Sequence, residues 1–178
     1  MIVDSAIIER ANEIVHDMTM PGMEEVGLAH GVCGQVNSFY MPTVNTIILC
    51  DEMIKAYPKI IPAVIAHEMG HAIIHQLDIP FTGSEEAAAD EISLVYMTNS
   101  GHLDETWDVA LAYAEMNLHE RYQPRDDHPN LANRAFNFAC AATGAEEALT
   151  AEPSKCKQYQ LRISRNWARL LVAYSHYE

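Results

Sequence analysis

The chain has 178 residues, 49% of them hydrophobic and 20% charged, and 25 Asp and Glu against 11 Lys and Arg give a formal net charge of −14. This hydrophobic content excludes a mainly disordered chain, and the length predicts a single domain over residues 1–178. The acidic balance argues against a nucleic-acid partner, and no apolar run approaches the ~20 residues that a membrane-spanning helix needs. We therefore expect a soluble, acidic domain.

Hydrophobic periodicity and turn residues divide the chain into helices and one hairpin. Pro21 ends the first helix, Pro62 suits the first turn of a later one, and Ser84 is a typical N-cap. The expected elements, in chain order, are a helix over residues 4–19, hairpin strands over 32–41 and 44–50, a short helix from 51 to about 58, and helices over about 62–77, 84–98, 104–121, 129–142 and 156–174. We predict a mostly helical α+β fold with a small antiparallel sheet near residues 32–50.

Four cysteines lie at positions 33, 50, 140 and 156, and their spacings match neither a zinc ribbon nor a redox motif. Buried reduced thiols are one interpretation, because the N-terminal residues show no signal-peptide pattern. Two disulfide bonds are the other, and they would indicate an exported protein whose leader has been removed. The sequence alone leaves both interpretations open.

The strongest chemical motif is His67-Glu-Met-Gly-His71, an H-E-x-x-H pattern on a predicted helix. Two histidines four residues apart share one helix face and are separated by ~6 Å along the axis, so their rings can converge on one metal ion. Zinc favours imidazole and carboxylate ligands, and Glu68 lies beside the pair as a base. The helix is otherwise apolar, and buried polar residues need partners, which a metal supplies.

A third ligand has to come from another element. His75 extends the histidine face, but it lies ~12 Å along the axis from His67, too far to share one ion. Its ordinary interpretation is a polar residue near a helix end, where the helix dipole favours it. Ile74 and Leu77 stand where a metzincin has Gly and His, so that class is excluded.

The better candidate is Glu86 at the start of the next helix. Glu86 and Asp90 are four residues apart and share one face, with three small alanines between them. We expect Glu86 to bind the metal and Asp90 to accept the free N–H of His67 or His71. Glu85 competes for the ligand role, but its five-residue spacing to Asp90 turns that pair off one face. Acidic first-turn residues of a surface helix are the ordinary alternative.

An H-E-x-x-H followed by E-x-x-x-D resembles the gluzincin signature, and the local sequence is similar to a bacterial family classed as metallopeptidases whose substrate is undetermined. The resemblance covers roughly residues 30–160. The matching stretches include C-G-Q-V-N-S-F-Y at 33–40, I-I-L-C at 47–50, H-E-M-G-H-A at 67–72, G-S-E-E-A-A-A-D at 83–90 and the segment 128–140.

The resemblance implies a zincin-like fold that holds one zinc ion per chain at His67, His71 and Glu86. It also favours two disulfide bonds, which are Cys33–Cys50 and Cys140–Cys156. Members of the family usually look exported, so we expect an extracytoplasmic or secreted protein after leader removal, or a cytoplasmic one if the cysteines are reduced.

A mechanism follows from this ligand set. Zinc lowers the pKa of its water towards ~7, and Glu68 takes the proton as water attacks a carbonyl and returns it to the leaving amine. A second group often stabilises the oxyanion, and His128, Tyr122 and Tyr40 are candidates that the sequence does not rank. His128 has the simpler interpretation of a helix-start residue.

The leading hypothesis is thus a zinc metallopeptidase, in the first place an endopeptidase, that acts on a peptide or protein. The net charge of −14 would mildly favour cationic peptides. One alternative is a non-catalytic zinc-binding protein that acts as a binding or regulatory module, although a merely structural site needs no base such as Glu68. The other is an acidic helical domain with a fortuitous motif, which the Glu86 and Asp90 pair disfavours.

Overall fold

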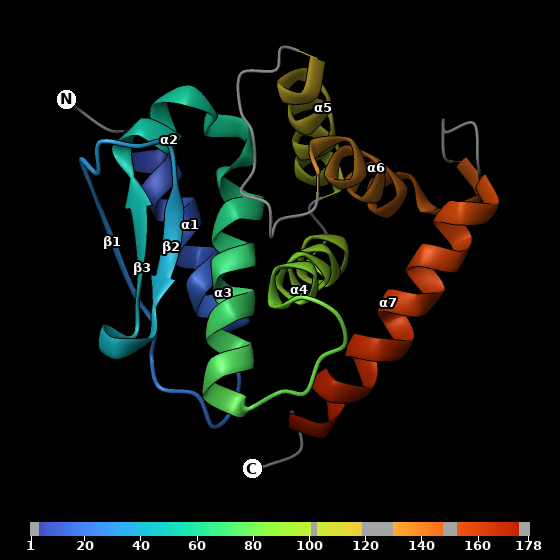
Figure 1. Ribbon diagram of the computed structural model, residues 1–178, viewed down its shortest axis with the longest axis horizontal. Coiled ribbons are helices and arrows are strands. Elements are labelled where there is room, and N and C mark those ends of the chain that lie inside the picture. The colour runs from blue at the N-terminus through green and yellow to red at the C-terminus, as the bar shows by residue number, and fades with distance from the viewer. Residues whose placement is uncertain (1–3, 101–102, 119–129, 148–152, 175–178) are drawn as a thin grey trace.

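The computed structural model describes residues 4–100, 103–118, 130–147 and 153–174 (Figure 1). The helices and strands of these residues follow in chain order: α1 (Ser5–Met18), β1 (Gly27–Gly31), β2 (Ser38–Met41), η1 (Pro42–Val44), β3 (Thr46–Cys50), α2 (Asp51–Ala56), η2 (Pro58–Ile60), α3 (Ile61–Leu77), α4 (Glu85–Asn99), α5 (Leu103–Leu118), α6 (Leu131–Glu147) and α7 (Pro153–Tyr174). The predicted mostly helical α+β class is confirmed.

Helix ends follow the predicted signals. The side chain of Ser84 caps α4 by accepting a hydrogen bond from the backbone N–H of Ala87 at 3.2 Å. Pro62 lies in the first turn of α3, where its missing N–H has no intrahelical partner to lose. Helix α3 ends at Leu77, and its C-cap residue Asp78 has a left-handed φ of 48°. The short connection to Ser84 therefore returns the chain directly onto α3.

The sheet differs in part from the predicted hairpin. Strand β2 pairs antiparallel with β3, as predicted, but β1 adds a parallel partner on the other side, giving the order β1-β3-β2. The predicted strand over residues 32–41 is wrong in its first part, because β2 begins only at Ser38. The backbone N–H groups of Cys33 and Gly34 donate to the Glu52 carboxylate at 3.1 and 2.7 Å instead of entering a sheet ladder.

Helix α3 is the centre of the fold. Figure 1 shows it between the sheet and α4, with α7 at the opposite side of the molecule from the sheet. Most residues of α3 are buried, and the surrounding core is aliphatic, with Ile14, Ile47, Ile65 and Met69 fully enclosed. His67 and Glu68 are therefore polar side chains on a buried helix. They need hydrogen-bond or ion-pair partners, because burying an unpaired polar group costs free energy.

Helices α3 and α4 approach each other closely at Gly70. A Cβ atom added there would lie 2.9 Å from the Cα atom of Ala89 and 3.0 Å from its carbonyl oxygen. Backbone atoms cannot move aside as a flexible side chain can. The small residues at this crossing thus set the distance between the two helices that carry the predicted ligands. A hydrogen bond from Ser93 Oγ to the carbonyl oxygen of Ala63, 3.1 Å long, fixes their relative position along the axes.

We expect Gly70→Ala to lower the free energy of unfolding, although alanine gains ~1 kcal/mol of helix propensity. Overpacking a tight contact costs about 1–3 kcal/mol, so the net change is a loss. Denaturant unfolding of the variant measures it. Gly31→Ala is the control, because nothing lies within 4 Å of a Cβ atom added at Gly31. Equal stability of the two variants would contradict the close helix contact.

Two disulfide bonds join the cysteines in the pairs that the resemblance implied. Cys33–Cys50 has a Cα–Cα distance of 5.4 Å and ties the loop before β2 to the end of β3. Cys140–Cys156 has a Cα–Cα distance of 5.3 Å and ties α6 to α7. Such bonds persist in oxidising compartments, so the pairs favour an extracytoplasmic environment. Within the part of the chain that the structure describes, no helix has the length and apolar character needed to cross a bilayer.

Candidate metal centre

Three side-chain atoms converge where the N-terminal turn of α4 faces α3. The Nε2 atom of His67 lies 3.0 Å from Oε2 of Glu86 and 3.1 Å from Nε2 of His71, and Nε2 of His71 lies 3.5 Å from the same Glu86 oxygen. The helical spacing of the histidines and the capped start of α4 together bring these atoms to one point.

These distances fit a tetrahedral metal site. Ligand atoms at about 2.0–2.1 Å from a tetrahedral zinc ion lie about 3.3 Å from one another, which is close to the three distances between the converging atoms. Two imidazole nitrogens and one carboxylate oxygen are also the kind of ligand set that a catalytic zinc site uses. The three residues His67, His71 and Glu86 therefore fit zinc in both geometry and chemistry.

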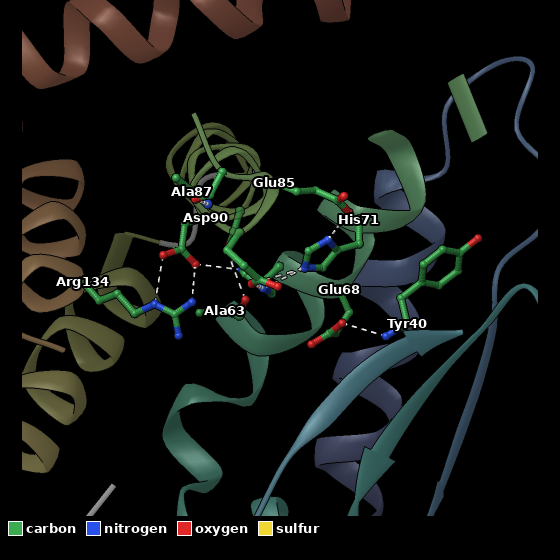
Figure 2. A network of polar contacts seen from close by, with 12 residues as sticks. Tyr40, Ala63, Glu68, His71, Glu85, Ala87, Asp90 and Arg134 are labelled. Carbon is green, nitrogen blue, oxygen red and sulfur yellow. Dashed lines mark hydrogen bonds and ion pairs between the residues drawn. The ribbon is translucent and has the colours of Figure 1, made fainter. Parts of the chain in front are cut away.

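The other nitrogen of each ring strengthens this fit. Nδ1 of His67 lies 2.8 Å from Oδ1 of Asp90, and Nδ1 of His71 lies 2.7 Å from Oε1 of Glu85 (Figure 2). An ionised carboxylate only accepts, so each Nδ1 carries the proton and donates it. The Nε2 atom of each ring then faces the Glu86 oxygen, to which it donates a hydrogen bond while it carries a proton. Once that proton is lost, the three electron-rich atoms repel one another at this distance unless a metal cation lies among them.

The pKa shifts in the cluster have the same cause. Burial alone would lower the pKa of His67, but the hydrogen bonds to Asp90 and Glu86 raise it to about 9. The pKa of His71 is also raised, because its bonds to Glu86 and Glu85 outweigh burial. Burial would raise the pKa of Glu86, but its hydrogen bonds to the two histidines hold it well below the usual range. The cluster thus attracts positive charge.

Glu68 is close to the converging atoms but is directed elsewhere. Its Oε2 atom accepts a hydrogen bond of 2.8 Å from the backbone N–H of Tyr40 in strand β2 (Figure 2). The side chain is buried and lines a cavity of about 360 Å³ together with His67, His71 and Glu86. The fold therefore keeps one carboxylate beside the cluster without placing it among the converging atoms.

The remaining predicted residues have varied positions. Asp90 was expected to accept the free N–H of His67 or His71, and in the structure it contacts His67. Glu85 makes the corresponding contact with His71. The hydroxyl of Tyr40 donates to Asn45 at 2.8 Å and lies away from Glu68, so it is not directed at the cluster (Figure 2).

His75 lines the cavity, and its ring centroid lies 6.2 Å from that of Tyr40. Tyr122 and His128, the other two predicted oxyanion-stabilising candidates, lie outside the described residues.

Sequence reasoning missed the role of Arg134. This side chain of α6 donates through Nε to Oδ2 of Asp90 at 2.9 Å and through Nη2 to Oδ1 at 2.7 Å. No local pattern relates two residues that are 44 positions apart. The available signal was indirect, since a buried aspartate needs a cationic partner and this acidic chain has only 11 Lys and Arg to provide one.

The comparisons with known proteins agree with a metal-dependent hydrolytic class. A model of the family DUF4344, described as "Putative metallopeptidase", matches residues 58–171, which contain the whole cluster and Arg134. The match covers more than half of the chain, and the chain belongs to this family. The same comparisons found no curated protein and no solved structure that matches the chain significantly.

We expect Asp90→Asn to weaken zinc binding about 10–100-fold, as is typical when the hydrogen-bond partner of a ligand histidine is changed. The amide is the same size as the carboxylate but is a weaker acceptor, so it holds the Nδ1 proton of His67 less firmly. Competition with a chromogenic chelator measures the affinity. A loss of less than twofold would mean that Asp90 does not support His67.

Proposed function

We propose that the protein is a zinc-dependent peptidase of the gluzincin type that hydrolyses peptide bonds. The observation that carries this proposal is the convergence of two imidazole nitrogens and a carboxylate oxygen at the wall of a cavity that also contains Glu68. A structural zinc site needs no such extra carboxylate and is usually closed by a fourth protein ligand.

His67, His71 and Glu86 would hold one zinc ion per chain. When bound, zinc supplies Lewis-acid chemistry, which makes water more acidic and polarises a substrate carbonyl. Asp90 and Glu85 support the ligand rings, because each accepts the Nδ1 proton and so keeps Nε2 free for the metal.

Glu68 would move the proton. The Tyr40 N–H holds its Oε2 atom at 2.8 Å, so Oε1 is the oxygen assigned to accept a proton from the attacking water. The same oxygen then donates that proton to the leaving amine, as a general acid. Burial around Glu68 limits competing solvent, and the bond to the β2 backbone limits rotation of the carboxylate.

An extended peptide is the substrate that the cavity suits. Ser38, Phe39 and Tyr40 of β2 line it, and β2 is an edge of the sheet, where a peptide can pair by strand addition. The described lining residues include Glu68, Glu85 and Glu86 but no Lys or Arg. Together with the net charge of −14, this lining favours peptides with basic side chains near the cleaved bond.

A peptide-library digest of the purified, zinc-loaded protein tests the proposal. Mass spectrometry of the products is expected to show cleavage that stops when a chelator removes the metal and returns when zinc is restored. Cleavage that survives complete metal removal would overturn the metal-dependent mechanism. A protein that holds one zinc ion but cleaves nothing would favour a binding or regulatory module instead.

A further inference from the structure

Asp90 is held from two sides. Its Oδ1 atom accepts hydrogen bonds from both His67 Nδ1, at 2.8 Å, and Arg134 Nη2, at 2.7 Å, while Oδ2 accepts from Arg134 Nε at 2.9 Å (Figure 2). Two parallel bonds between a guanidinium and a carboxylate fix the plane of both groups. The carboxylate therefore has one defined orientation, and in that orientation Oδ1 is directed at the His67 ring.

This arrangement is buried and rigid. The side chains of Arg134 and Asp90 are each only 9% exposed, so water compensates little of either charge and the two groups depend on each other. The guanidinium carbon of Arg134 also lies 5.7 Å from the ring centroid of Tyr113 in α5, a contact that restricts the arginine further. Among the hydrogen bonds of the described residues, loss of Arg134 would leave the Asp90 carboxylate with its bond to His67 alone.

We propose that Arg134 is a positioning residue of the metal centre, which acts through Asp90 to hold the His67 ring in the orientation that binds metal. This inference rests on the proposed zinc site. The proposed ligands all come from α3 and α4, and the inference adds a supporting side chain, Arg134, from α6.

Zinc affinity of folded variants tests the inference. Arg134→Met is expected to weaken zinc binding about 10-fold or more, within the ~10–100-fold range for partners beyond the ligands. In an Asp90→Asn background the same change is expected to have no further effect, because the pathway through Asp90 is already broken. Arg134→Lys keeps the charge but not the two parallel bonds, and is expected to restore only part of the affinity.

Arg10→Met is the matched control. Arg10 also makes two hydrogen bonds to one carboxylate, that of Glu105, at 2.7 and 3.2 Å, but this pair joins α1 to α5, and the cluster lies on α3 and α4. It is expected to lower stability and leave zinc affinity unchanged. The comparison separates positioning of the metal centre from a general contribution to folding.

The outcomes are distinct. Folded Arg134→Met protein with wild-type zinc affinity would overturn the inference, as would equal losses from Arg134→Met in the wild-type and Asp90→Asn backgrounds. If Arg134→Met does not fold, Arg134→Lys carries the test, and wild-type affinity in that variant would overturn the role of the paired bonds. A wild-type protein that binds no zinc would instead overturn the proposed function on which the inference rests.

Discussion

Glu68→Gln is expected to leave zinc bound and the fold intact while it lowers the rate of peptide hydrolysis by ~10²–10⁴-fold, the usual effect of removing a general base. The amide has the size of the carboxylate, and its oxygen can still accept the hydrogen bond that Tyr40 N–H now donates to Oε2. It has no basic oxygen to take a proton from water. Steady-state kinetics on a cleaved peptide, together with metal analysis of the same sample, measures both effects.

Glu85→Gln is the matched control for this variant. Glu85 lines the same cavity and supports His71, so the change of acid to amide can weaken zinc binding, as Asp90→Asn does, but it removes no proton acceptor for water. At saturating zinc we therefore expect its rate to stay within a few-fold of the wild-type rate. Loss of zinc in Glu68→Gln would make Glu68 a ligand, and undiminished cleavage would assign the base to another residue or to a contaminating peptidase.

His71→Ala is expected to abolish stoichiometric zinc binding, and His67→Ala likewise. Either change leaves two of three protein ligands, which is fewer than catalytic zinc sites use. Glu86→Ala is expected to weaken binding severely, because it removes the carboxylate oxygen that lies 3.0 Å from His67 Nε2. Elemental analysis after dialysis against defined zinc concentrations gives the stoichiometry for each variant.

His75→Ala provides the comparison for the histidine variants. This residue lies one turn beyond His71 on the same helix and lines the same cavity, but it is not among the converging residues. We expect it to retain one zinc ion per chain. Stoichiometric zinc in His71→Ala, or its loss in His75→Ala, would show that the ligands are wrongly assigned.

Local patterns predicted those parts of the fold that local interactions determine. The apolar periodicity over residues 4–19 and the cap at Ser84 gave helix ends close to those of α1 and α4. Strand β1 was missed because its sequence, Gly27 to Gly31, has no β-branched residue and pairs with β3, which lies about 19 positions further along. Partners so distant in sequence leave no periodic signal.

The same distinction applies to the site. The sequence could predict that His67 and His71 lie close together, because helix geometry alone puts them on one face. It could also predict that Glu86 lies near them, because a short connection returns α4 to α3. The role of Arg134 was not predictable, since its contact with Asp90 depends on how α6 packs against α4. The loop around Cys33 likewise departs from a strand because Glu52, from α2, binds its backbone.

A crystal structure of the zinc-loaded protein with an anomalous difference map at the zinc edge tests the central claim most directly. We predict one anomalous peak per chain, bound by Nε2 of His67, Nε2 of His71 and a carboxylate oxygen of Glu86 at about 2.0–2.2 Å. Glu68 is expected beside the ion but outside bonding distance. A peak held by other residues, or no peak at saturating zinc, would contradict the assignment of the metal centre.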